Sequence, residues 1–278
     1  MSEPSVTDQG GTAAVVAEVP VLAIEHVSRR FGGLIAVNDV DFSVVPGEIF
    51  ALIGPNGAGK TTLFNGITGL FPPTSGRILF FGRDLTRRPP HAIAALGIAR
   101  TFQNIRLFDQ MSALDNVKVG CHVRMRSRLW DSLLHLPWER REEGRIDEKA
   151  RELLRFVGIE RFADDYARNL PYGQQRRLEI ARALATEPRL LLLDEPAAGF
   201  TPQEKVELMS LMRAIQRQGI TVFLIEHDMR LVMGVAERIV VLDHGEMIAQ
   251  GSPEKVRANP RVIEAYLGKP AGATAEEP

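Results

Sequence analysis

A glycine-rich segment, Gly54–Thr61 (GPNGAGKT), constrains the fold of this chain more than any other feature. Its glycines let the backbone curl so that several N–H groups converge on one point, and a helix that follows directs its positive end there. The apolar segment Glu48–Ile53 precedes the loop, and Thr61–Leu70 follows it with a helical pattern. A strand, a loop and a helix in this order predict a phosphate-binding site in an α/β fold, rather than a chance glycine-rich turn.

The loop residues are therefore candidate contacts to a nucleotide. Lys60 can reach the β- and γ-phosphates, and the Thr61 hydroxyl can bind Mg²⁺. We expect ATP and Mg²⁺ as ligands. The predicted nucleotide contacts in this part of the chain are Gly54, Pro55, Asn56, Gly57, Ala58, Gly59, Lys60, Thr61 and Thr62.

A second cluster of chemically useful residues follows two other apolar segments. Leu190–Asp194 reads as a buried strand that ends in Asp194 and Glu195, and His227 comes just after the strand Val222–Ile225. Buried strands deliver their last residues to the carboxyl edge of the sheet, where α/β proteins bind ligands. Asp194 is predicted to hold Mg²⁺ through water, and Glu195 to polarise the attacking water. A solvated turn for the acids and a structural role for the histidine are the alternatives.

Strands that alternate with helices predict a sheet with crossover connections. The strands stop between Met111 and about Asp165, where the pattern is helical, so a helical subdomain is inserted into the sheet. Near the end of the chain, Arg238–Leu242 and Glu246–Gln250 predict a hairpin.

Composition limits the classes of function. A net charge of −1 gives no overall basic field, so we expect no nucleic-acid partner.

The single cysteine, Cys121, excludes an intramolecular disulfide, fits a reducing cytoplasm and is expected to be a buried small hydrophobe. No apolar run reaches the roughly 18 residues that span a bilayer, and residues 1–20 lack the features of a secretory signal. Residues 1–20 and 269–278 are expected to be disordered tails.

These segments, in this order, resemble the nucleotide-binding domain of ABC transporters from about Val21 to Leu267. The resemblance implies the α/β fold class with a P-loop NTPase (RecA-like) core sheet, an antiparallel β subdomain and an inserted α-helical subdomain. It implies one nucleotide-binding domain at 21–268, with the helical part at about 104–172.

The resemblance also implies roles for individual residues. Phe31 occupies the position of the aromatic residue that stacks on adenine. Gln103 lies in the loop that links the site to the membrane partner, and it is a further candidate contact to nucleotide and metal. Glu195 matches the general base and His227 the switch histidine. The family signature matches Leu170–Gln175, which makes Tyr172, Gly173 and Gln174 contacts to the nucleotide of a second domain packed head to tail.

Three positions depart from the family pattern. Pro171 and Tyr172 stand where the signature usually has Ser-Gly, which removes a hydroxyl near the γ-phosphate. Phe31 replaces the commoner tyrosine. Thr201 stands where an aspartate is frequent, so it can hydrogen-bond across a dimer but brings no charge.

Other runs look like the branched-chain amino acid importers: Gly97–Phe108, Tyr172–Arg182, Pro196–Gly199 and Val262–Gly268. The resemblance implies a peripheral ATPase at the cytoplasmic face of the cell membrane. Its partners would be a second ATP-binding subunit, two integral-membrane permease subunits and, indirectly, a solute-binding protein. Urea, amides or other hydrophobic amino acids remain open as cargo. A soluble ABC-type ATPase with no membrane partner and a regulator that never hydrolyses ATP are the other classes.

The segment 122–149 interleaves arginines with tryptophans, including Arg126, Arg128, Trp130 and Trp138. It is either a surface that touches the permease or lipid headgroups, or an amphipathic helix packed on its own subdomain.

Overall fold

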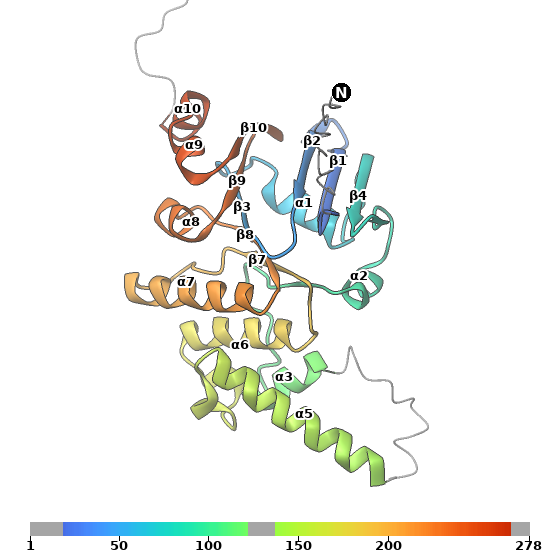
Figure 1. Cartoon of the computed structure of the whole chain (residues 1–278), viewed down its shortest axis with the longest axis vertical. Coiled ribbons are helices and arrows are strands. Elements are labelled where there is room, and N and C mark those ends of the chain that lie inside the picture. Colours follow the sequence, from blue (N-terminus) through green and yellow to red (C-terminus); the bar gives the residue numbers. More distant parts are fainter. Residues whose placement is uncertain (1–18, 122–136, 268–278) are drawn as a thin grey trace, which may run out of the picture.

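The structure of this chain is a computed structural model that describes residues 19–121 and 137–267, with side chains at residues 143–266 in the second range. The predicted tails, apart from Val19 and Pro20, lie outside the described residues, as does most of the arginine- and tryptophan-containing segment. Figure 1 shows the two sheets in the upper and middle parts of the molecule and a helical part below them.

A six-stranded sheet forms the centre, in the order β10-β9-β3-β8-β7-β6. Neighbouring strands run parallel except β10, which pairs antiparallel with β9. Three inner strands are buried along their whole length, which explains their continuous apolar sequences. The strands are β3 (Ile49–Ile53), β6 (Ile98–Arg100), β7 (Leu190–Asp194), β8 (Thr221–Ile225), β9 (Arg238–Asp243) and β10 (Glu246–Gly251).

An antiparallel sheet covers one side of this centre, in the order β2-β1-β4-β5. Helix α1 (Lys60–Ile67) shares a buried apolar cluster with both sheets (Figure 1). In that cluster the rings of Phe42 and Phe50 stack at 5.3 Å, and Phe50 meets Phe223 edge to face at 5.0 Å. The strands are β1 (Leu22–Phe31), β2 (Leu34–Val44), β4 (Ser75–Phe80) and β5 (Arg83–Asp84).

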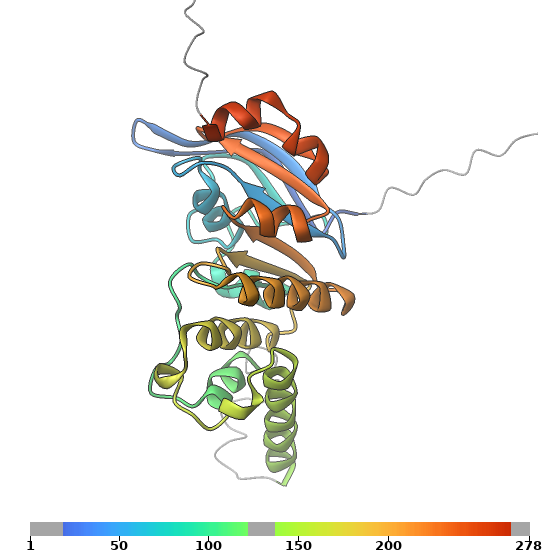
Figure 2. The same cartoon turned by 90° about the vertical axis from the view of Figure 1, so that its left-hand side faces the viewer.

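The helical part lies at the end of the molecule opposite helices α9 and α10 (Figure 2). It contains α3 (Ala113–Cys121), α5 (Pro137–Phe156), the short 3₁₀ turns η2 (Glu160–Phe162) and η3 (Ala167–Asn169), and α6 (Tyr172–Leu184). Between β6 and β7 the described residues contain no strand, as the predicted insertion requires. The boundaries 104–172 stay a prediction. Cys121 is buried, as expected.

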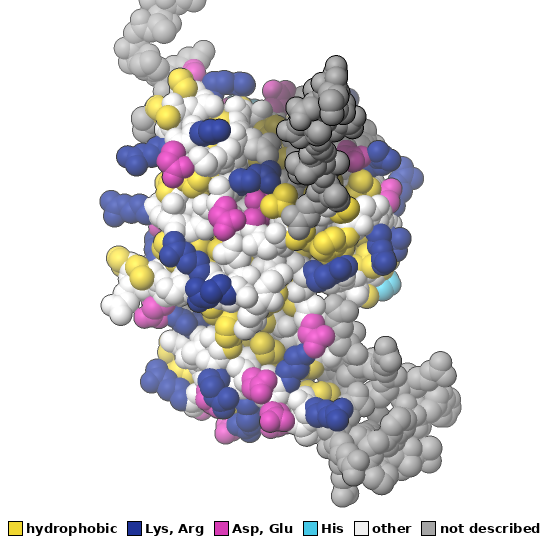
Figure 3. All heavy atoms as spheres, viewed as in Figure 1, with side chains coloured by type: hydrophobic (Ala, Val, Ile, Leu, Met, Phe, Trp, Pro, Cys, Tyr) yellow, Lys and Arg dark blue, Asp and Glu magenta, His cyan; other side chains and the backbone are white. Residues whose placement is uncertain are grey.

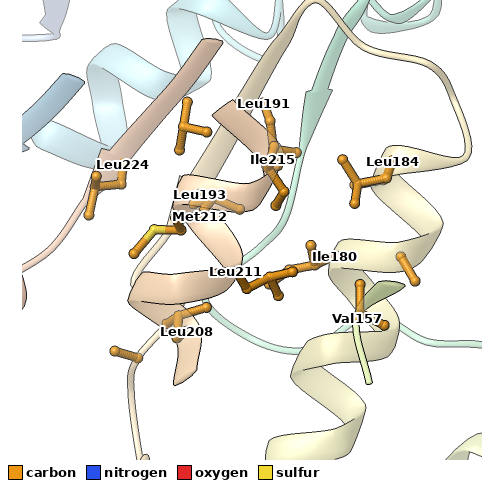
Figure 4. Packing of buried hydrophobic residues seen from close by; sticks show 14 of the residues in the cluster. Val157, Ile180, Leu184, Leu191, Leu193, Leu208, Leu211, Met212, Ile215 and Leu224 are labelled. Atoms are coloured by element: carbon orange, nitrogen blue, oxygen red, sulfur yellow. The ribbon is translucent and has the colours of Figure 1, made fainter. Parts of the chain in front are cut away.

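Helix α7 (Pro202–Arg217) joins the helical part to the sheet. Figure 4 shows Ile180 of α6 and Leu211 of α7 pointing toward one another, and both belong to the larger buried cluster together with Leu193 of β7. Thr201 caps α7 by accepting the Glu204 N–H, while the Glu204 carboxylate accepts the Thr201 N–H. This capping box and the proline at the first helical position explain why the helix begins at Pro202.

The remaining helices are α2 (Pro90–Leu96), α8 (Met229–Val235), α9 (Pro253–Arg257) and α10 (Pro260–Leu267). Within 19–121 and 137–267, no helix is both long enough and apolar enough to cross a membrane. On the face in Figure 3, basic and acidic side chains are interspersed with small hydrophobic patches.

Candidate functional site

A cavity of about 590 Å³ opens where the glycine-rich loop follows β3. The antiparallel sheet contributes one wall, the loop and the start of α1 form the floor, and three side chains come from elsewhere in the chain. The lining residues are Phe31, Leu34, Ile35, Ala36, Asn56, Gly57, Ala58, Gly59, Lys60, Thr61, Thr62, Gln103, Glu195 and His244. The structure therefore brings the loop together with Phe31, Gln103 and Glu195, whereas Gly54 and Pro55 lie outside the lining.

The loop is packed so tightly that two of its positions require glycine. Gly59 has φ +97°, and an added Cβ would lie 2.3 Å from the Ala36 carbonyl oxygen of β2. A Cβ at Gly54 would lie 2.1 Å from the Leu242 carbonyl oxygen of β9. The loop backbone is thus held between the two sheets, and its shape is set before any ligand binds.

Lys60 is the buried cation of the loop. Its Nζ donates to the Gly54 and Pro55 carbonyl oxygens at 2.6 and 2.9 Å. Burial lowers the pKa of Lys60, and the nearby carboxylates of Glu195 and Asp194 oppose that shift. The side chain is therefore fixed at the floor of the cavity, where polyphosphate oxygens would add to its hydrogen bonds.

Phe31 lies at the open end of the cavity with 41% of its surface exposed. The Arg29 guanidinium lies over this ring, 4.5 Å from the centroid, and Phe71 meets it edge to face. A base that stacks on Phe31 must therefore use the ring face opposite Arg29. The sequence interpretation missed Arg29, for which it offered no signal.

Glu195 and Gln103 are in direct contact. Gln103 Nε2 donates to Glu195 Oε2 at 3.0 Å. The Glu195 backbone has φ +48°, a conformation that residues other than glycine seldom adopt, and its N–H donates to the Ile225 carbonyl oxygen of β8. His227 Nδ1 lies 3.8 Å from Glu195 Oε1, beyond hydrogen-bond distance, and its side chain is exposed. The three predicted residues gather at the carboxyl edge of the sheet.

Asp194 already has a charged partner. Its carboxylate accepts from Arg100 Nη2 at 2.7 Å, and both side chains are almost fully buried. Thr61, Gln103 and Asp194 supply a hydroxyl, an amide and a carboxylate, whose oxygens are the ligands that Mg²⁺ prefers. No group of three or more His, Cys, Asp or Glu in the part of the chain that the structure describes could hold a metal ion. Thr61, Gln103 and Asp194 therefore stay the predicted ligands.

Glu226 is a buried acid that the sequence interpretation missed. It accepts the Ala197 N–H at 2.9 Å and the His227 N–H at 3.1 Å. Burial raises the pKa of this carboxyl, although the hydrogen bonds oppose the shift. Glu226 thus ties the segment after Glu195 to the segment that carries His227. Its position at the end of an apolar strand was the available signal.

The hairpin β9–β10 also reaches the loop. Its turn residues His244 and Gly245 both have positive φ, as a two-residue type I′ turn requires. The Gly245 N–H donates to the Ala58 carbonyl oxygen, and its carbonyl accepts the Asn38 N–H at 2.8 Å. From α10, Tyr266 is hydrogen-bonded to the Gly54 backbone, and burial raises the pKa of its phenol to about 12.

The predicted signature residues stand apart from this cavity. Tyr172, Gly173 and Gln174 lie at the start of α6, and none of them lines the cavity. Tyr172 is 47% exposed. A Cβ added at Gly199 would lie 3.1 Å from the Tyr172 ring, so this ring rests against the segment that leads to α7. One chain therefore presents a phosphate cavity and, separately, an exposed helix start.

Comparisons with known proteins agree with this geometry. The profile of the family described as "ABC transporter" matches residues 37–198, and that of "Branched-chain amino acid ATP-binding cassette transporter" matches residues 246–272. The high-affinity branched-chain amino acid transport ATP-binding proteins LivG of Escherichia coli (strain K12) and BraF of Pseudomonas aeruginosa are each 46% identical over 90% of this chain and 98% of their own length.

Solved structures give the same picture. A nucleotide-free ATP-binding cassette from an ABC transporter is 33% identical, with a TM-score of 0.78 over 90% of this chain and 100% of that one. A dimeric cassette in a post-hydrolysis state, bound to ADP and Pi, is 26% identical, with a TM-score of 0.71 over 84% of this chain and 98% of that one.

Proposed function

This chain belongs to the ABC transporter family of ATP-binding cassettes, and from that premise we propose that it hydrolyses ATP to power the import of branched-chain amino acids. The observation that carries the ATPase assignment is the single cavity lined by the glycine-rich loop, Lys60, Gln103 and Glu195. The cargo assignment is supported by the names of the 46% identical relatives and by the family match at residues 246–272.

The cavity has groups that suit both the phosphates and the adenine ring of a nucleotide. The loop N–H groups and the start of α1 surround the phosphates, and Lys60 adds a positive charge at the floor. The adenine ring stacks on the open face of Phe31. The polyphosphate then points toward Glu195 and Gln103 at the opposite wall.

The hydrolytic step uses the carboxylate of Glu195 as the general base. It accepts a proton from the water that attacks the γ-phosphate, while Gln103 Nε2 holds the carboxylate in place. His227, which is exposed and lies close to Glu195, turns to donate to a γ-phosphate oxygen.

Thr61, Gln103 and Asp194 are the residues that would hold Mg²⁺, which when bound neutralises negative charge on the phosphates. Because Arg100 already occupies one side of the Asp194 carboxylate, Asp194 would hold the cation through water rather than as a direct ligand. Arg100 keeps the carboxylate oriented toward the edge of the sheet.

The working enzyme is a dimer with a second ATP-binding subunit, packed head to tail. Tyr172, Gly173 and Gln174 lie outside this chain's own cavity, so they complete the site of the partner subunit. Backbone N–H groups at the start of α6 and its dipole suit the negative γ-phosphate there.

The permease contact is an apolar groove of about 730 Å³ beside Gln103. Phe102, Leu107 and Phe108 from the loop after β6 line it together with Ile93 of α2, and Phe108 is 46% exposed. A permease segment seated there would move the Gln103 loop directly. The subunit then works as a peripheral protein at the cytoplasmic face of the membrane, and a solute-binding protein delivers the cargo from the other side.

The test is reconstitution with the permeases, the second ATPase subunit and the solute-binding protein of the same transporter. We expect ATP-dependent uptake of leucine, isoleucine and valine into vesicles, and none with the Glu195→Gln chain. Uptake of urea or amides in place of these amino acids would overturn the cargo. Absence of ATP hydrolysis by the complete assembly would overturn the motor assignment.

A further inference from the structure

Helix α6 carries a buried ion pair that no step of the proposed hydrolysis uses. Arg176 and Glu179 are 3% and 2% exposed, and Arg176 Nη1 lies 3.3 Å from Glu179 Oε2. Burial of such a pair costs free energy unless further hydrogen bonds satisfy both partners. The partners that this pair has found therefore indicate what it does.

Those partners are the backbone atoms around Gln103. Arg176 Nη1 donates to the Phe102 carbonyl oxygen at 2.6 Å, and Nη2 donates to the Gln103 carbonyl oxygen. Glu179 Oε1 accepts the Phe102 N–H at 3.2 Å. The pair thus binds the N–H and the carbonyl of Phe102 and the carbonyl of Gln103. The side chain of Gln103 in turn donates to Glu195 at 3.0 Å.

The same guanidinium also reaches the exposed start of α6. Arg176 Nη2 donates to Tyr172 Oη at 3.0 Å, one helical turn away. The Tyr172 ring rests against Gly199. A continuous series of contacts therefore runs from Glu195 through Gln103 and Arg176 to Tyr172.

Arg177, the next residue, has a different environment. Its Nη1 donates to the Val157 carbonyl oxygen at 2.8 Å, and its Nη2 donates to Glu207 at 2.5 Å. These contacts tie α6 to the residue that follows α5 and to α7, and they do not include Gln103 or Tyr172. Arg177 is therefore a matched control on the same helix turn.

We propose that Arg176, held by Glu179, is a positioning residue that couples the two ATP sites of the dimer. This inference rests on the proposed function, since Tyr172 has a nucleotide to contact only in the head-to-tail dimer. When Tyr172 meets the nucleotide held by the partner subunit, Arg176 passes the displacement to the Gln103 backbone. The Gln103–Glu195 hydrogen bond of this chain's own site then changes with the state of the other site.

The test is a double-mutant cycle in the assembled transporter, with Tyr172→Phe and Gln103→Ala. With Arg176 present, we expect the two substitutions to be non-additive in kcat by about fivefold or more. In the background Arg176→Met/Glu179→Leu, which removes both charges and leaves no unpaired one, we expect the cycle to become additive. In the Arg177→Gln background the non-additivity should persist.

Two further readouts separate positioning from a merely structural effect. In the Arg176→Met/Glu179→Leu background, the affinity of this chain's own cavity for ATP and the unfolding transition should stay near those of the Arg177→Gln control, while the Hill coefficient of ATP hydrolysis falls toward one. Non-additivity that survives without the ion pair would overturn the proposal. Loss of all ATP hydrolysis in the unmodified assembly would instead overturn the proposed function.

Discussion

The guanidinium of Arg100 and the carboxylate of Asp194 form an ion pair at the carboxyl edge of the central sheet, with Nη2 and Oδ2 2.7 Å apart. Arg100 Nη1 also donates to Asn65 Oδ1 of α1 at 2.8 Å and to Oγ1 of Thr68, the residue that follows α1, at 3.2 Å. One side chain from β6 therefore fixes the last residue of β7 and the helix that follows the phosphate loop. Charge-assisted hydrogen bonds between buried groups fix the orientation of both side chains and also stabilise the fold.

The first prediction concerns the stability of this pair. Arg100→Leu leaves the Asp194 charge buried and unpaired, so we expect a loss of about 3–5 kcal/mol in the free energy of unfolding. Arg100→Leu combined with Asp194→Asn should recover part of that loss. The control is Arg77→Leu, which breaks an exposed pair with Glu25 and should cost at most about 1 kcal/mol. Urea unfolding measures all four chains, and equal losses for the two single variants would contradict the assignment.

The second prediction concerns nucleotide affinity. Lys60→Ala removes the buried ammonium at the cavity floor, and hydrogen bonds to charged groups are worth about 1.5–3 kcal/mol each. We expect the Kd for MgATP to rise by about 10- to 100-fold. Lys205→Ala is the control, because Lys205 pairs with Asp228 outside the cavity lining. Binding of a fluorescent ATP analogue gives both values. Unchanged affinity in the Lys60 variant would remove that residue from the site.

The third prediction separates chemistry from binding. Glu195→Gln keeps the size of the side chain but removes the proton acceptor, so kcat should fall by about 10²- to 10⁴-fold. ATP affinity should stay within about threefold, and the ATP-bound dimer should accumulate because hydrolysis no longer releases it. Size-exclusion chromatography with and without ATP detects that dimer. Normal turnover by this variant would refute the general-base role.

The fourth prediction concerns pH. Burial raises the pKa of Glu226 above its ordinary value of 4.5. At a pH between 4.5 and this raised pKa, the Glu226 carboxyl holds a proton in the folded protein but has lost it in the unfolded chain. Stability contributed by that proton is present at low pH and declines as pH rises through the raised pKa. Relative to Glu226→Gln, the natural chain should therefore lose free energy of unfolding as pH rises above about 4.5, and the difference should be constant at lower pH. A difference that grows in the opposite direction would contradict the raised pKa.

The sequence predicted the helices and strands whose burial is visible in the local pattern of residues. The continuous apolar run of β7 gave that strand its correct bounds, because burial leaves a local mark in the sequence. Strand β2 begins at Leu34, where its first residues are exposed or half-buried and show no strict alternation, so the start of this strand leaves no clear mark in the sequence. The two-residue strand β5 was missed because so short an element carries no periodicity.

In the candidate site too, local motifs identified some residues, and tertiary packing alone identified others. The loop motif and the strand-end argument placed Lys60 and Glu195, since local sequence determines where such residues lie relative to a sheet. Arg100 and Arg176 escaped notice because charged residues usually lie at the surface, and only tertiary packing supplies their buried partners. The contact between Gln103 and Glu195 likewise joins segments far apart in the chain.

The turn of the β9–β10 hairpin bonds to Ala58 on one side and to Asn38 on the other. The β9–β10 hairpin thus connects the antiparallel sheet to the glycine-rich loop. A version cut short before Arg238 would lose that fastening as well as two strands. Truncation for crystallography or fusion work should therefore leave the hairpin whole, even though every sequence motif for ATP lies upstream of it.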